Sequence, residues 1–236
     1  MRSPPRPVHA VLFDLDGTLV DSEIHTDQSI SGVLAQYGLE DFRLPHTETH
    51  GRTWLHIADK IRERTKIDRA STLIAADLLA HWNDVAIDIK PIPGAPEAVR
   101  AAAACNLRLG IVSSSPRSVI DSFLDKLGVG ECVERRARIG GDAVSRTKPD
   151  PEGYLLAART LAVEPANTLV FEDSRAGLLA ARAAGMRSMF VTCCAPDIAG
   201  NTAIATASCI HYRALPPDFW ERLADGRYDI AGRSFT

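Results

Sequence analysis

Short apolar runs alternate with segments of helical spacing along most of the chain. Five runs have the length of buried strands, and they lie at residues 9–13, 107–112, 137–139, 168–171 and 188–191. Helices are predicted beside them at residues 95–104, 117–127, 151–161 and 175–184. Strands that alternate with helices in this way predict an α/β fold, in which helices cover both faces of a doubly wound parallel sheet.

One long segment departs from this alternation. No convincing strand occurs between residues 22 and 89, where Ile30 and Val33 begin a helical spacing of apolar side chains. Further helices are predicted at residues 54–65 and 71–87. We therefore expect an all-helical domain inserted into the α/β fold.

The expected domains have simple boundaries. Residues 8–20 and 92–236 form the predicted α/β core, and residues 21–91 form the helical insertion. The chain has 236 residues, of which 45% are hydrophobic, so it can bury a core in the larger domain and support a smaller one. The proline-rich residues 1–7 are expected to be a disordered tail.

The amino-acid composition indicates which partners and which cellular compartment to expect. The net charge is −3 and no aromatic-basic patch stands out, so no nucleic-acid partner is expected. The five cysteines lack metal-ligand spacing, and an odd number does not suit a disulfide framework. No apolar run approaches transmembrane length, and the start of the chain lacks the pattern of a signal peptide. We expect a cytoplasmic protein without membrane contact, either a monomer or a homodimer.

Two aspartates follow the first predicted strand. Asp14 and Asp16 lie one residue apart, and Gly17 lets the backbone turn directly after them. A carboxylate can act as the nucleophile that forms an aspartyl-phosphate, and Mg²⁺ favours sites made of one or two carboxylates with phosphate oxygens. This pair therefore predicts Mg²⁺-dependent phosphoryl transfer.

Three further polar groups follow predicted strands or precede helices. The hydroxyls of Ser113 and Ser114 open a helix whose backbone N–H groups can receive an anion. Lys148 precedes another helix, and Glu172 and Asp173 end an apolar run. Ligands in parallel sheets collect at the carboxyl ends of the strands, so all these groups are expected in one crevice with the two aspartates.

In this order the motifs resemble those of the haloacid dehalogenase superfamily. Its signature is DxDGT, followed by a Ser or Thr, a Lys and an acidic pair. The chain is similar to the branch of β-phosphoglucomutases and sugar phosphatases, in which a helical cap of the C1 type follows the first motif. The resemblance implies a Rossmann-like core and a hydrolase that acts on phosphoric monoesters. It covers residues 9 to about 191.

The resemblance also implies a role for each motif residue. Asp14 attacks phosphorus, and Asp16 first protonates the leaving group and then activates water. Ser113, Ser114 and Lys148 hold the phosphoryl oxygens. The residues expected to hold Mg²⁺ are Asp14, Asp16, Asp173 and, as a less certain ligand, Glu172.

Cap residues are expected to select the substrate, a small phosphorylated metabolite such as a sugar, polyol or sugar-acid phosphate. Gly51 matches a cap glycine of this branch, and its neighbour Arg52 could bind a second anionic or polar group. His25 could handle protons, although it lies one residue before the histidine of the sugar phosphomutases, where this chain has Thr26. For His50, packing is the more common role.

Two other functions remain open beside the phosphatase. A sugar phosphomutase would share every core residue and differ only in its cap. A phosphoacceptor or binding module would need a nucleophile without a matched acid and base, which Asp16 argues against. A dehalogenase would need neither a metal nor the second aspartate, so Asp16 and the acidic pair Glu172-Asp173 argue against that activity.

The aromatic residues Tyr212, Phe219 and Trp220 near the end of the chain are expected to dock onto the core.

Overall fold

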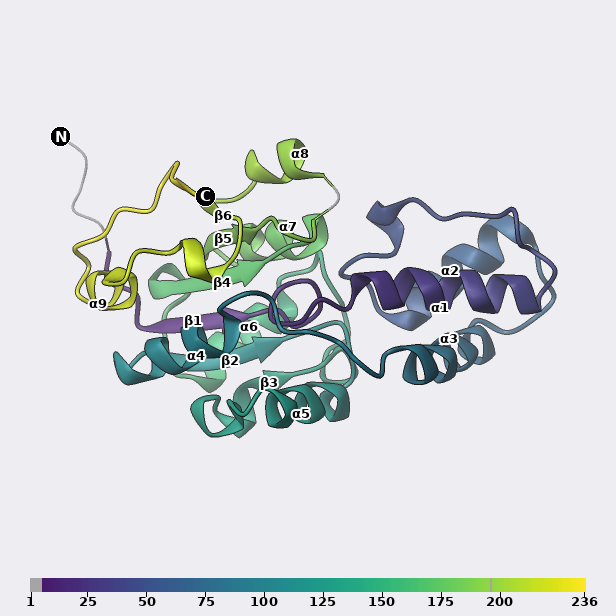
Figure 1. Ribbon diagram of the computed structural model, residues 1–236, viewed down its shortest axis with the longest axis horizontal. Coiled ribbons are helices and arrows are strands. Elements are labelled where there is room, and N and C mark those ends of the chain that lie inside the picture. The colour runs from purple at the N-terminus through teal and green to yellow at the C-terminus, as the bar shows by residue number, and fades with distance from the viewer. Residues whose placement is uncertain (1–5, 196) are drawn as a thin grey trace.

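The computed structural model describes residues 6–195 and 197–236, which form a parallel sheet flanked by helices and a helical unit to one side (Figure 1). The sheet has seven strands in the order β3-β2-β1-β4-β5-β6-β7, and every neighbouring pair is parallel. The strands are β1 (Ala10–Phe13), β2 (Arg108–Val112), β3 (Arg138–Ile139), β4 (Thr168–Glu172), β5 (Arg187–Val191), β6 (Ala207–Cys209) and β7 (Ser234–Phe235). The predicted parallel α/β sheet is confirmed.

Helices cover both faces of this sheet. Those of the sheet region are α4 (Ala95–Ala104), α5 (Arg117–Lys126), α6 (Glu152–Thr160), α7 (Arg175–Ala183), α8 (Ile198–Thr202) and α9 (Phe219–Ala224). Alternate residues of β1 point to opposite faces, as the period of a strand requires. Val11 packs in the apolar cluster that includes α4 and α5, whereas Leu12 packs in the cluster that includes α6 and α7. The sheet is therefore doubly wound, as predicted.

Three helices and the segments that join them form the helical unit, which we call the cap. Its helices are α1 (Glu23–Gln36), α2 (Trp54–Thr65) and α3 (Ser71–Val85), and a short 3₁₀ helix, η1 (His46–Glu48), precedes α2. Helix α3 packs against both α1 and α2. Ile30, Ile57 and Leu78, one from each helix, lie in a separate apolar cluster of the cap. The cap thus has a small core of its own.

Two chain segments that lie side by side connect the cap to the sheet region. The backbone N–H of Asp21 donates to the carbonyl of Lys90 over 2.8 Å, and that of Ile92 donates to Leu19 over 3.0 Å. An antiparallel bridge pairs Val20 with Pro91. The first segment follows β1 and the second, which pairs with it, precedes α4, so the cap is attached beside the carboxyl end of the strand that leads to Asp14.

The end of the chain extends the sheet by two strands that the sequence pattern did not predict. Strands β6 and β7 add to the edge next to β5. Tyr212 stacks on Phe171 of β4 with ring centroids 5.2 Å apart, and Trp220 packs on the same ring at 5.6 Å. The expected docking of these aromatic residues onto the core is confirmed.

Two further expectations concern the N-terminal tail and membrane-spanning segments. Residues 1–5 of the predicted tail lie outside the described part of the chain. Across residues 6–195 and 197–236, each helix is too short or too polar to cross a bilayer.

Candidate active site

A buried lysine lies between two buried carboxylates at the carboxyl end of the sheet. Asp14 follows β1 and Glu172 ends the neighbouring β4. The Nζ of Lys148 is 2.5 Å from Asp14 Oδ1 and 2.5 Å from Glu172 Oε1. All three side chains are at most 5% exposed. The residues of three predicted motifs are therefore in direct contact.

Burial and charge act against each other on this triad. Burial raises the pKa of Asp14 well above its usual value, and the ammonium of Lys148 opposes that shift. Burial alone would lower the pKa of Lys148, but the carboxylates of Asp14 and Glu172 raise it above its ordinary value. Lys148 therefore carries a positive charge beside Asp14, the predicted nucleophile.

Both carboxylate oxygens of Glu172 accept hydrogen bonds from protein groups. Oε1 accepts from Lys148 and from the hydroxyl of Tyr154 at 2.7 Å. Oε2 accepts from the backbone N–H and the hydroxyl of Ser174, both at 3.0 Å. A Cβ atom on Gly177 would lie 1.7 Å from Oε1, so the next helix must have a glycine there. These contacts hold the Glu172 carboxylate in place, and that carboxylate in turn positions the ammonium of Lys148.

Hydroxyl groups hold the second aspartate. Asp16 Oδ1 accepts from Ser22 Oγ at 2.7 Å, and Oδ2 accepts from Ser115 Oγ at 2.9 Å. Ser113 Oγ lies 3.4 Å from the same Oδ2 and accepts from the backbone N–H of Ser115. The side chain of Ser114 donates to the carbonyl of Gly51 over 2.9 Å, and Ser114 lines the cavity described below. Of the two predicted phosphate-binding serines, only Ser113 therefore contacts Asp16.

Carboxylate oxygens of Asp14, Glu172 and Asp173 lie within 4.8 Å of one another. Asp173 Oδ1 accepts from Thr18 Oγ1 at 3.1 Å, while its buried Oδ2 accepts no hydrogen bond from the described residues. Gly17 has a positive φ of 74°, and a Cβ there would lie 2.1 Å from that Oδ2. The site is thus a narrow cradle of hard oxygen donors, which fits Mg²⁺.

The acidic cradle concentrates negative charge in a buried place. Burial, and then the nearby carboxylates of Glu23 and Glu172, raise the pKa of Asp173 well above its usual value. A bound cation would offset this repulsion. Among the predicted metal ligands, Asp14, Glu172 and Asp173 each offer an oxygen to the cradle, although the Glu172 oxygens also accept hydrogen bonds from protein groups. The carboxylate of Asp16, the fourth predicted ligand, instead accepts from Ser22 and Ser115.

A narrow cavity of about 30 Å³, partly open to solvent, lies between the core and the cap. Asp14, Asp16 and Ser115 line it from the core. Cap residues that line it are Glu23, Thr26, Thr49, Gly51, Arg52, Trp54, Ile57, Leu79 and Trp82. The predicted crevice therefore has a lid of cap side chains, which can contact the leaving group of a substrate.

Two of the predicted cap residues join the cap to the core. Arg52 Nη1 donates to the carbonyl of Lys148 over 2.7 Å, and its pKa is lowered because the side chain is half-buried. Gly51 has a φ of 66°, and a Cβ there would lie 2.4 Å from Ser174 Oγ. The third, His25, is not among the residues that line the cavity and lies 3.3 Å from Gln28 Oε1, while Thr26 lines it.

Several residues of the site were not found by sequence reasoning. Ser22 and Ser115 resemble ordinary helix-start hydroxyls, and Tyr154 occupies an apolar position of a helix. Glu23 resembles a first-turn helix acid, yet it is 6% exposed and faces the cavity. Burial raises the pKa of Glu23 to about 7, with His50 opposing the shift. Only the three-dimensional contacts distinguish these residues.

Comparison with known proteins identifies the family of this chain. The family model described as haloacid dehalogenase-like hydrolase matches residues 11–191, which include every core motif. The chain belongs to the haloacid dehalogenase-like hydrolases. The resemblance drawn from the sequence is thereby confirmed, as is the predicted class of hydrolase that acts on phosphoric monoesters.

Similar proteins include phosphatases. Validoxylamine A 7'-phosphate phosphatase of Streptomyces hygroscopicus subsp. limoneus is 34% identical over 74% of this chain and 81% of its own length. Hexitol phosphatase B of Escherichia coli (strain K12) is 30% identical over 80% of this chain and 86% of its own. The solved β-phosphoglucomutase of Clostridium difficile shares the fold, with a TM-score of 0.73 and 20% identity over 92% and 97% of the two chains.

Proposed function

We propose that this haloacid dehalogenase-like hydrolase is a Mg²⁺-dependent phosphatase of a small phosphorylated metabolite, a sugar, polyol or sugar-acid phosphate. The observation that carries the proposal is the arrangement at one end of the cavity. Asp14 lies 2.5 Å from the Nζ of Lys148, and Asp16 is held by hydroxyls beside it. The names of the two relatives above, which specify phosphorylated small molecules, support this class of substrate.

In the proposed first step, a carboxylate oxygen of Asp14 attacks phosphorus and the bond from phosphorus to the ester oxygen breaks. Asp16 donates its proton to the departing oxygen, which leaves as an alcohol. Asp14 is then an aspartyl-phosphate. The positive charge of Lys148, fixed by Glu172, stabilises the negative charge on the transferring phosphoryl group.

In the second step, the Asp16 carboxylate takes a proton from a water molecule that attacks the same phosphorus atom. The acyl phosphate bond breaks, inorganic phosphate leaves, and both aspartates return to their starting states. Mg²⁺, held by Asp14 and Asp173 together with the backbone carbonyl of Asp16, would supply further positive charge at the phosphoryl oxygens. The hydroxyls of Ser22 and Ser115 keep the Asp16 carboxylate beside the cavity through both steps.

The cavity lining supports a polar, hydroxyl-bearing leaving group. Arg52, Glu23 and Thr49 offer donors and acceptors, while Trp54 and Trp82 provide apolar walls on which carbon atoms of a sugar or polyol can pack. A phosphomutase would use the same core. The position expected for its histidine holds Thr26, which lines the cavity in place of His25, and this favours the phosphatase.

The test is release of inorganic phosphate from a panel of phosphorylated sugars, polyols, sugar acids and nucleotides. Wild-type protein should release phosphate from one group of these substrates with Mg²⁺ and not with chelator. Asp14→Asn should abolish release, whereas Asp41→Asn, a matched change at an exposed aspartate of the cap, should leave it unchanged. Release that survives Asp14→Asn would refute the proposal, and isomerisation of a hexose phosphate with a bisphosphate activator would show a mutase.

A further inference from the structure

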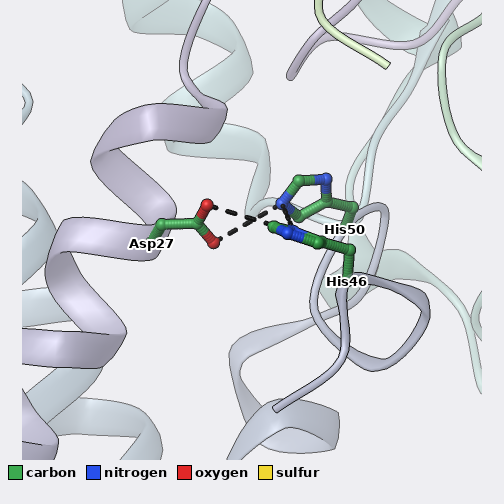
Figure 2. Close-up of side chains that lie close together, drawn as sticks. All are labelled: Asp27, His46 and His50. Atoms are coloured by element: carbon green, nitrogen blue, oxygen red, sulfur yellow. Dashed lines mark hydrogen bonds and ion pairs between the residues drawn. The ribbon is translucent and has the colours of Figure 1, made fainter. Parts of the chain in front are cut away.

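A second cluster of ligand-type side chains lies within the cap. Asp27 projects from α1, His46 belongs to η1, and His50 follows in the next turn; Figure 2 shows the three side chains pointing toward one another. His46 Nδ1 is 3.1 Å from His50 Nε2, and Asp27 Oδ1 is 3.5 Å from the same nitrogen. Asp27 Oδ2 is 4.0 Å from His46 Nδ1.

These separations are those of atoms that surround a cation. Zn²⁺ binds imidazole nitrogen and carboxylate oxygen at about 2.0–2.2 Å, so two ligand atoms of a tetrahedral site lie roughly 3.3 Å apart. The His46–His50 pair at 3.1 Å and the His50–Asp27 pair at 3.5 Å are close to this value, and the His46–Asp27 pair, which involves the other Asp27 oxygen, is longer at 4.0 Å. Because each residue comes from a different turn or element of the cap, a single ion can bridge all three.

A buried carboxylate gives independent support. Glu23 is 6% exposed, and its Oε2 accepts no hydrogen bond from residues 6–195 and 197–236. That oxygen lies 3.4 Å from His50 Nε2. His50 Nε2 is thus approached by His46 Nδ1 and by oxygens of Asp27 and Glu23. A single N–H bond can point to only one of these acceptors, whereas a cation among them attracts all of them.

We propose that Asp27, His46 and His50 bind a divalent transition-metal ion of the Zn²⁺ type. Two imidazole ligands favour Zn²⁺, Cu²⁺ or Ni²⁺ over Mg²⁺, which prefers oxygen donors. The site is therefore chemically distinct from the all-oxygen cradle around Asp173. Glu23 Oε2 is the nearest further donor on the buried side.

The surroundings allow an ion to enter. The side chains of His46 and Asp27 are 56% and 45% exposed, whereas that of His50 is 7% exposed. His46 and His50 also line a solvent-open hollow beside Arg175 of α7. An ion here would tie α1 to the segment that carries Gly51 and Arg52, and so would fix the part of the cap that contacts the core.

The experiment is calorimetric titration of Zn²⁺ into the whole, metal-free protein without substrate, with Mg²⁺ in excess. Wild type should bind one equivalent tightly. His46→Ala and Asp27→Ala should each weaken binding by at least about 10- to 100-fold, since loss of only an outer-shell partner has that effect. His56→Ala, a matched histidine elsewhere in the cap, and Asp173→Asn, which alters the core cradle, should keep the tight site.

Three results would overturn the proposal. These are no Zn²⁺ binding by wild type, unchanged binding in both His46→Ala and Asp27→Ala, or loss of binding in Asp173→Asn alone. His46 is largely exposed, so its replacement leaves the fold intact, which circular dichroism checks. Because no substrate is present, the result does not depend on the proposed phosphatase activity.

Discussion

Replacing Lys148 with methionine removes the only cation that contacts the buried carboxylates of Asp14 and Glu172 in the described residues. The methionine side chain fills a similar volume, so the main change is electrostatic. Removing one partner of a buried ion pair costs about 3–5 kcal/mol, because the remaining charge is left uncompensated. We expect Lys148→Met to lower the free energy of unfolding by an amount in this range at neutral pH, measured in chelator.

The same substitution should introduce a dependence on pH. Burial raises the pKa of Asp14 and Lys148 opposes that shift, so in Lys148→Met the pKa of Asp14 rises further. A carboxyl group with a raised folded-state pKa stabilises the fold fully below its unfolded pKa and loses that contribution as pH rises through the folded value. The deficit relative to wild type should therefore be smaller near about pH 5 than above pH 7.

Urea unfolding at several pH values tests both expectations. Lys126→Met provides the control, because Lys126 is an exposed lysine on α5 and its loss should cost about 0–1 kcal/mol at every pH. If Lys148→Met costs no more than this control, or if its deficit does not grow with pH, then Lys148 does not neutralise the two carboxylates and the electrostatic account is wrong.

Three further substitutions test the supports of the site. Tyr154→Phe removes a buried hydroxyl that donates to Glu172 over 2.7 Å and should cost about 1.5–3 kcal/mol in urea unfolding; no measurable loss would contradict that contact. Gly177→Ala places a methyl group 1.7 Å from Glu172 Oε1 and should cost about 1–3 kcal/mol or more, with a parallel fall in phosphatase activity; full activity would show that Glu172 need not hold Lys148. Arg52→Ala should lower kcat/KM for the preferred metabolite by about 10- to 100-fold and change turnover of p-nitrophenyl phosphate much less; equal losses for both would assign Arg52 no role in selectivity.

The sequence predicted the central sheet closely and missed its edge. Strands such as β1 and β4 are continuous apolar runs because both their faces are buried, and such runs are visible in a sequence. Strands β6 and β7 have only three and two residues and include serines. Their place at the edge depends on pairing with β5 and with each other, which is a tertiary effect that no local pattern reports.

For the site, motif order located the charged residues but not their supports. Asp14, Lys148 and Glu172 follow strands or precede helices, and the parallel topology brings them together. The roles of Tyr154 and Ser115 depend on single long-range contacts, to Glu172 and Asp16. A tyrosine on an apolar helix face and a serine at a helix start have common structural roles, so their sequence context carries no signal of these contacts.

The most direct test of the proposed mechanism is whether a phosphoryl group is transferred to Asp14. Asp16→Asn should remove the base that activates water, while p-nitrophenyl phosphate supplies a leaving group that needs little protonation. With Mg²⁺ present, rapid mixing should give a burst of one nitrophenolate per site. Mass spectrometry of the acid-quenched protein should then find the phosphoryl group on the peptide that contains Asp14. Steady release without a burst, or a phosphoryl group on another residue, would contradict the account.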